Sequence, residues 1–177
     1  AFDVTYRLVF TTQPTDTIAA AVIMPAVQVA IQDGTGATIT TATDSITLAI
    51  ANNPGGASLT GVTSVSAVNG VAAFPGVSLD RAGAGYTLSA AATGLIAGVS
   101  TAFSVTYNLV FTVQPATTMS GTAITPAVQV SIQDALGNTI ASATDSVTVA
   151  IGANPGGGTL SGTQTVAAVN GVAAFSG

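Results

Sequence analysis

Apolar and polar residues alternate with a period of two along most of the chain, which is the pattern of half-buried β-strands. Val27, Val29 and Ile31 form one apolar set, and the segment 45–50 forms another through every second residue. No stretch keeps the spacing of an amphipathic helix, and β-branched residues crowd the alternating segments. The pattern predicts an all-β protein with further strands at 7–11, 64–68, 71–74, 86–92 and 101–107.

Turn-forming residues separate these segments. Asn69-Gly70 lies between two apolar alternations and recurs at Asn170-Gly171, which predicts a tight hairpin in each place. About seven short strands, separated by turns every 8–12 residues or so, are typical of an antiparallel β-sandwich of immunoglobulin type. Further turns are predicted at 33–36, 53–56, 82–85 and 134–138.

The chain also repeats itself. Residues 1–76 align without a gap onto residues 102–177, at a constant spacing of 101, and about 47 of the 76 paired positions are identical. A repeat of this length has the size of one small domain. We therefore expect a tail strand of a preceding repeat at 1–6, a first immunoglobulin-like repeat of about 100 residues at 7–106, and a second repeat at 107–177 that is incomplete at its C-terminal side.

The junction between the two copies has no linker. Residues 101–106 read as the last strand of one domain and residues 107–113 as the first strand of the next, with no Gly/Ser-rich or Pro-rich stretch between them. Adjacent domains should therefore have little freedom relative to each other, and an array of them should form a stiff rod.

Three segments resemble the bacterial Ig-like (Big) domains, which occur in tandem in large cell-surface and secreted proteins such as invasin- and intimin-type adhesins. These segments are 130–138, in which a strand runs into an Asp-x-x-Gly-Asn turn, 157–162 and 169–175. The resemblance implies an immunoglobulin-like sandwich and an extracellular or cell-surface location. The first copy departs from the pattern, because Ala37 stands where the turn asparagine is expected.

The chain has few charged residues, and this excludes several classes of function. Charged residues make up 5% of the chain, against about 25% in ordinary soluble proteins. The net charge is -5 and the only bases are Arg7 and Arg81, so we expect no binding of nucleic acid. The longest apolar segment, 18–31, is interrupted by Pro25 and Gln28 and is shorter than the roughly 20 residues of a spanning helix, so we expect no membrane span.

The residue types needed for catalysis are missing. The sequence has no His, Cys or Lys, which leaves no Ser–His or Cys–His pair and no amine nucleophile. We therefore predict that the protein is not an enzyme and uses no cofactor. Four acids, Asp33, Asp44, Asp134 and Asp145, recur at the repeat spacing in turn-like contexts, where aspartate commonly caps its own backbone.

Other candidate ligand sites have simpler interpretations. Calcium needs about six or seven oxygen ligands, and the best place for a site of that kind is a domain junction near Asp3 or Asp16, whose counterparts are not acidic. The glycine runs at 55–56 and 156–158 follow Asn-Pro and precede no Lys, which indicates loops and not a phosphate cradle. Tyr6, Tyr86 and Tyr107 could stack on sugar rings, but Tyr6 and Tyr107 lie at domain starts and Tyr86 resembles a sandwich core or corner residue. We predict no catalytic, cofactor-binding or metal residues.

These observations favour a structural role, as a subunit of an extracellular fibre, sheath or stalk. The partners would be copies of the chain or adjacent repeats, joined end to end. Lateral packing is a further option because an uncharged surface of small residues is easily desolvated. Donation of a strand such as 1–6 to an incomplete neighbour is another. The alternatives are a solitary spacer whose threonines could carry surface glycans, and an adhesin segment or carbohydrate-binding module.

Overall fold

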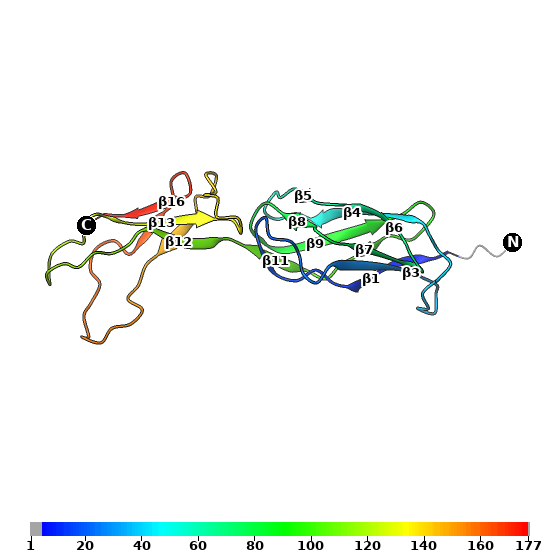
Figure 1. Cartoon of the computed structure of the whole chain (residues 1–177), viewed down its shortest axis with the longest axis horizontal. Coiled ribbons are helices and arrows are strands. Elements are labelled where there is room, and N and C mark those ends of the chain that lie inside the picture. The colour runs from blue at the N-terminus through cyan, green and yellow to red at the C-terminus, as the bar shows by residue number, and fades with distance from the viewer. Residues whose placement is uncertain (1–4, 177) are drawn as a thin grey trace. The chain divides into compact units, whose positions relative to one another are not determined.

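A computed structural model describes residues 5–176, which form β-strands and contain no helix. The chain divides into two compact units, Ala1–Thr106 and Tyr107–Gly177, and each is described by itself (Figure 1). The prediction of an all-β protein is confirmed. The tail strand expected at 1–6 falls mostly on residues 1–4, which lie outside the described part of the chain.

Unit 1 consists of two main sheets and one short strand pair. The first sheet has the strand order β1-β3-β7, and the second has the order β2-β11-β9-β4-β6 with β10 beside β9. All neighbours are antiparallel except β2 and β11, which run parallel. The strands are β1 (Arg7–Thr12), β2 (Thr17–Ile18), β3 (Val27–Gln32), β4 (Ser45–Asn52), β5 (Leu59–Thr60), β6 (Ser64–Ser66), β7 (Val71–Phe74), β8 (Ser78–Leu79), β9 (Gly83–Ala91), β10 (Gly98–Val99) and β11 (Phe103–Thr106), with β5 and β8 forming the short pair.

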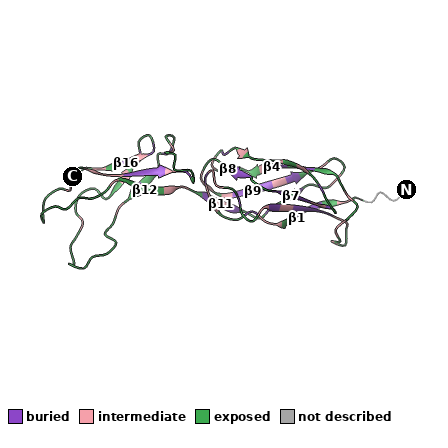
Figure 2. Ribbon diagram, in the orientation of Figure 1, coloured by how far each residue is buried: buried purple, intermediate pink, exposed green. Residues whose placement is uncertain are grey.

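The core of unit 1 lies between the two main sheets. Every second residue of the long strands is buried, as the alternation predicts, and β1, β9 and β11 carry the buried stretches seen in Figure 2. Each large aliphatic or aromatic side chain buried in this way contributes roughly 1.5–3 kcal/mol. The fully buried side chains come from both sheets and include Val29, Ile31, Ile46, Phe74, Tyr86 and Leu88. Unit 1 is therefore sandwich-like.

Tyr86 fixes the second sheet to the neighbouring loops. Its ring is fully buried and lies 6.0 Å from the ring of Phe103 in β11. Its hydroxyl donates to the carbonyl oxygens of Arg81, at 3.0 Å, and Ala82, at 3.3 Å. Gly55 packs so closely here that a Cβ atom would run into the Ala82 carbonyl and the Tyr86 hydroxyl. The glycine is therefore required by the space that Tyr86 occupies.

The Asn69-Gly70 turn differs from the predicted hairpin in what it connects. Both residues have positive φ, at 51° and 77°, and Val68 and Val71 exchange two backbone hydrogen bonds of 2.9 and 3.1 Å, so the tight turn is confirmed. However, β6 pairs with β4 and β7 pairs with β3, so the turn carries the chain from one sheet to the other. The prediction of a hairpin is therefore wrong beyond this bridge. An isolated two-stranded hairpin is only marginally stable, so each strand is more stable when it pairs within a larger sheet.

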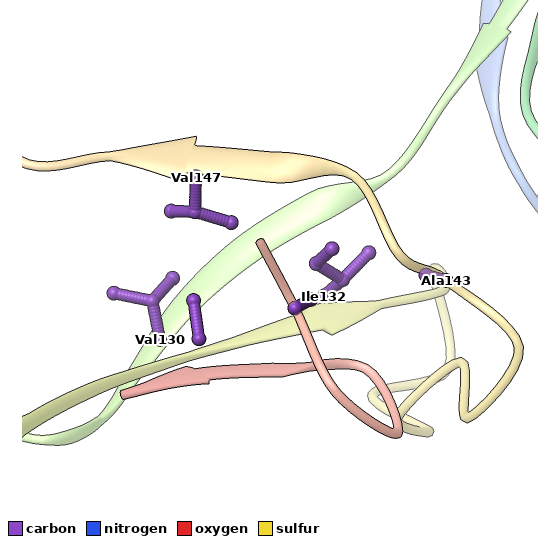
Figure 3. Close-up of a cluster of buried hydrophobic side chains, with 6 residues drawn as sticks. Val130, Ile132, Ala143 and Val147 are labelled. Atoms are coloured by element: carbon purple, nitrogen blue, oxygen red, sulfur yellow. The ribbon is translucent and has the colours of Figure 1, made fainter. Parts of the chain in front are cut away.

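The first sheet of unit 2 has the same strand bounds and the same residue pairing as the first sheet of unit 1, shifted by 101 residues. Its strands are β12 (Asn108–Val113), β13 (Val128–Gln133), β14 (Ser146–Thr148), β15 (Thr165–Ala167) and β16 (Val172–Phe175). β12, β13 and β16 form one antiparallel sheet and β14 and β15 a second. Val147 of β14 points towards β13, which carries Val130 and Ile132, and these side chains form a small buried cluster (Figure 3).

The inner face of unit 2 is much more exposed than that of unit 1. Leu8 and Phe10 lie opposite Ile31 and Val29, as their counterparts Leu109 and Phe111 lie opposite Ile132 and Val130, so both pairs belong to the core face. Yet Leu8 and Phe10 are 3% and 6% exposed, whereas Leu109 and Phe111 are 58% and 45% exposed.

The second sheet accounts for this difference. Among the described residues of unit 2, no strand occupies the place that β9 and β11 have in unit 1, and β14 spans three residues where β4 spans eight. The same apolar pattern is therefore covered in one unit and open in the other.

Gly55→Ala should destabilise unit 1, because the added Cβ must displace the Tyr86 hydroxyl or the loop backbone. We expect the free energy of unfolding of unit 1 to fall by about 1–3 kcal/mol. The matched variant is Gly156→Ala in unit 2, where a Cβ meets nothing within 4 Å. That variant should leave stability unchanged or raise it by about 0.4–1 kcal/mol.

Urea titration followed by the NMR signals of each unit measures both effects. Equal losses from the two variants would contradict the assigned packing of Gly55 against Tyr86.

Candidate functional site

The carboxylate of Asp33 closes the turn after β3. Its Oδ1 accepts hydrogen bonds from the backbone N–H of Thr35 at 2.9 Å, the hydroxyl of Thr35 at 2.7 Å and the backbone N–H of Ala37 at 3.0 Å. The Thr35 hydroxyl, followed by the Ala37 N–H, lowers the pKa of Asp33 below the ordinary value of 3.8. The predicted turn-capping role of Asp33 is confirmed.

Asp134 has the same role in unit 2, with one different partner. Its Oδ1 accepts from the backbone N–H groups of Leu136 and Asn138, each at 2.9 Å, and its Oδ2 accepts from the side-chain amide of Asn138 at 3.0 Å. This amide is the largest cause of a lowered pKa of Asp134. Both carboxylates are thus engaged in local hydrogen bonds.

The other acids of the described residues contact backbone groups. Asp44 and Asp145 accept from Ala67 and Ala168 through their backbone carbonyl oxygens, each at 3.0 Å, so side-chain capping is shown only for Asp33 and Asp134. Asp16 and Asp80 instead link distant segments through Oδ1. Asp16 accepts from the N–H of Ser104 at 2.6 Å, and Asp80 accepts from the N–H of Ser58 at 2.7 Å.

The residues around Asp16 do not provide a set of calcium ligands. Within residues 5–176, no three His, Cys, Asp or Glu side chains lie close enough together to hold a metal ion. Asp3 lies outside the described residues. The one carboxylate that the structure describes at this place is used to hold β11 beside the loop that precedes β2.

The tyrosines and glycine-rich loops follow the simpler interpretations. Tyr86 is buried, so its ring cannot stack on a sugar and its interpretation as a core or corner residue is confirmed, while Tyr6 and Tyr107 are half-buried. The loop after β4 is closed by Asn53, whose side chain exchanges hydrogen bonds of 2.7 and 2.8 Å with the backbone of Ala57. Asn154 and Gly158 make the same closure in unit 2, at 2.7 and 2.8 Å.

The outward face of the second sheet of unit 1 carries small, uncharged residues. Paired residues share a face, which places Ser45 opposite Ser66, Thr47 between Ser64 and Ala91, and Ala49 opposite Ser89. We call these residues the hydroxyl face. The Ser64 hydroxyl lies 3.2 Å from the hydroxyls of both Ser45 and Thr47, and a shallow depression lies beside Thr47 and Thr93. Sequence reasoning predicted small uncharged surfaces but could not place these residues on one face.

The hydroxyl face has a counterpart in unit 2 on a shorter scale. Thr148 of β14 and Thr165 of β15, which are paired, have hydroxyl oxygens 2.8 Å apart. Such a surface offers many weak donors and acceptors and little charge to desolvate. Chemically it suits packing against another uncharged surface better than the capture of a charged ligand.

Comparison with known proteins leaves the family open. No family model and no curated protein matches the chain. Among solved structures, two of the β-glucuronidase of Parabacteroides merdae are similar, at 20% and 21% identity with TM-scores of 0.37 and 0.38. Each match covers 56% of this chain and 12% of the enzyme chain, so the chain spans about an eighth of that enzyme's length. Within residues 5–176 no helix is long and apolar enough to cross a bilayer.

The turn carboxylates should titrate below their ordinary range. In an NMR titration of the folded protein, we expect the pKa of Asp33 and that of Asp134 below 3.8. Because folding lowers these pKa values, the stabilisation they provide is fully present above about pH 4 and is lost as the pH falls through the folded-state pKa.

Thr35→Ala is the matched test of the cause. It should move the pKa of Asp33 back towards 3.8 and leave that of Asp134 unchanged. A pKa of Asp33 that ignores the loss of the hydroxyl would contradict the assigned hydrogen bond.

Proposed function

We propose that the chain is a structural segment of an extracellular or cell-surface protein, built from tandem immunoglobulin-like sandwiches of about 100 residues each. The observation that carries this proposal is the correspondence of the two units. The pairs Leu8–Ile31 and Phe10–Val29 recur at Leu109–Ile132 and Phe111–Val130, each shifted by 101 residues. An array of one module is a common way to build length.

The strand order of unit 1 supports an immunoglobulin-like topology. Of its seven strands with three or more residues, the first, second and fifth in chain order form one sheet, and the third, fourth, sixth and seventh form the other. The sixth strand, β9, carries a tyrosine whose hydroxyl returns to backbone carbonyls four and five residues upstream, as in the tyrosine corner of immunoglobulin-type sandwiches. These features support the resemblance to bacterial Ig-like domains that the sequence motifs suggest.

The rod form of the array rests on its junction. β11 ends at Thr106 and β12 begins at Asn108, so Tyr107 alone separates the last strand of one unit from the first strand of the next. A connection of one residue leaves few backbone dihedrals free. Tyr107 also packs against the buried cluster of unit 2, which favours a stiff junction.

The hydroxyl face supports lateral packing of such rods into a fibre or sheath. Soluble proteins commonly guard exposed sheets and edges with Lys and other charges, and this chain has no Lys. We propose that copies pack side by side through the hydroxyl face, and that the protein has no catalytic role. Contacts of this kind depend little on charge, so salt should not loosen them.

A stiff junction predicts that both units align as one body. Residual dipolar couplings measured on the full chain should fit a single alignment tensor with nearly equal magnitude for the two units. Insertion of Gly-Gly-Ser-Gly-Gly-Ser after Tyr107 is the control, and it should lower the alignment of one unit relative to the other. Independent tensors in the unmodified chain would contradict the rod.

Lateral packing predicts self-association that a single charge disrupts. Light scattering at high protein concentration should show oligomers that persist in high salt. Ala49→Lys, on the hydroxyl face, should return the chain to a monomer, whereas Ala73→Lys, at an exposed alanine of β7, should not. A strictly monomeric chain in all conditions, or binding of the chain on a glycan array, would favour the solitary spacer or the carbohydrate-binding alternative instead.

A further inference from the structure

We propose that Asn69-Gly70 is a latent deamidation site, which the fold keeps unreactive and which converts to aspartate or isoaspartate when the turn opens. The same proposal applies to Asn170-Gly171, because the stretches 67–74 and 168–175 are identical. It does not depend on the rod or on lateral packing, since it uses only the chemistry and the contacts of this turn. It gives the chain a site of covalent modification that needs no enzyme.

The reaction needs only Asn69, Gly70 and water. The backbone nitrogen of Gly70 attacks the side-chain carbonyl carbon of Asn69 and forms a new C–N bond. The proton of that nitrogen passes through water to the side-chain NH2 group, which leaves as ammonia, so a five-membered succinimide remains. Water then adds to one of the two ring carbonyls and breaks its bond to nitrogen, which gives aspartate or isoaspartate. No atom is oxidised or reduced in these steps.

The fold requires the residue that makes this attack easiest. Glycine has no side chain that could shield its nitrogen. Gly70 has a φ of 77°, and a Cβ added to it would run into the Ile39 carbonyl group, so no larger residue fits there. Asn69 is exposed, so water reaches its side chain. The pair therefore has the accessible amide and the unshielded nitrogen that the reaction needs.

In the folded chain the two reacting atoms are held apart. Asn69 has a φ of 51°, in the left-handed region, whose usual ψ of about +47° turns the next nitrogen away from Cβ. Ring closure needs the Gly70 nitrogen on the same side as the Asn69 side chain. However, the Gly70 N–H donates to the carbonyl oxygen of Ala42 at 3.2 Å, and the Gly70 carbonyl accepts from the N–H of Ile31 at 2.8 Å. The attack therefore requires the turn to open.

The second turn has the same arrangement. Asn170 and Gly171 have φ values of 50° and 76°, and the Gly171 carbonyl accepts from the N–H of Ile132 at 2.8 Å. A Cβ added to Gly171 would run into the Ile140 carbonyl group. Both turns therefore combine a reactive pair of residues with a backbone conformation that prevents the reaction.

The two products differ in how they fit the turn. Aspartate has the size of asparagine and tolerates positive φ, so it can take the place of Asn69 without a change in the backbone. Isoaspartate adds one carbon atom to the main chain of the turn. Val68 and Val71 exchange hydrogen bonds of 2.9 and 3.1 Å across the turn, and Gly70 packs against a carbonyl group. The longer main chain cannot keep these contacts, so a turn that opens and forms isoaspartate does not close again.

The first test compares the full chain with a synthetic peptide of residues 66–73 in the same mildly alkaline buffer. Mass spectrometry of peptic fragments measures the conversion of Asn69. We expect the peptide to react at least tenfold faster, because a hydrogen-bonded turn within a folded unit opens rarely. In urea above the unfolding transition, the chain and the peptide should react at equal rates. Asn138 is the internal control, and in urea it should convert more slowly than Asn69 because the side chain of Thr139 shields the attacking nitrogen.

A second test separates the two products. Asn170→Gly allows the positive φ to be kept and leaves Asn69 as the only asparagine followed by glycine. Chains of this variant that have reacted in urea are separated into aspartate and isoaspartate forms and refolded. For the aspartate form, and for the matched variant Asn69→Asp, amide exchange at Ile31 should stay within about twofold of that in the unreacted chain. For the isoaspartate form, it should be at least tenfold faster.

Three results would overturn the proposal. Conversion of Asn69 in the folded chain as fast as in the peptide would show that the fold does not hold the reacting atoms apart. Absence of conversion in urea would show that the pair is not reactive. An isoaspartate form with Ile31 as well protected as in Asn69→Asp would show that the turn accommodates the longer main chain.

Discussion

The pairing of β9 with β4 is the constraint on which unit 1 depends. It places Tyr86, Leu88 and Ala90 over the first sheet and gives β11 a strand to pair with. Among the described residues of unit 2, no strand pairs with β14 in the way that β9 pairs with β4, and Leu109 and Phe111 are exposed although their own strand pairs normally. Burial of a large side chain such as Tyr86 or Leu88 contributes roughly 1.5–3 kcal/mol, so this pairing is a large term for a small domain.

The comparison of the two units separates what local sequence determines from what tertiary contacts determine. The carboxylate turns at Asp33 and Asp134, the loops closed by Asn53 and Asn154, and the tight turns at Asn69 and Asn170 form in both units. These features need only residues within a few positions of each other. The length of β4, in contrast, depends on a strand that lies about 40 residues further along the chain.

The same distinction explains which structural features could be predicted from the sequence. Period-two alternation predicted the strands at 27–32 and 45–50, and the position of Tyr86 predicted a core or corner residue, because these signals are local or depend on residue type. The sheet change at Asn69-Gly70 could not be predicted, since the turn chemistry is that of a hairpin and the choice of partner is made by β3 and β4. The hydroxyl face also depends on strand order, which alternation does not specify.

The central claim is that pairing with β9 is what holds β4 and protects the second sheet of unit 1. Amide hydrogen exchange on the full chain tests it most directly at matched positions, 46–50 against 147–151, with Ile31 against Ile132 as the internal reference. The account predicts that the amides of 147–151 exchange at least a hundredfold faster than those of 46–50. This ratio of rates should exceed the ratio of the Ile132 rate to the Ile31 rate. Equal protection of 46–50 and 147–151 would contradict it.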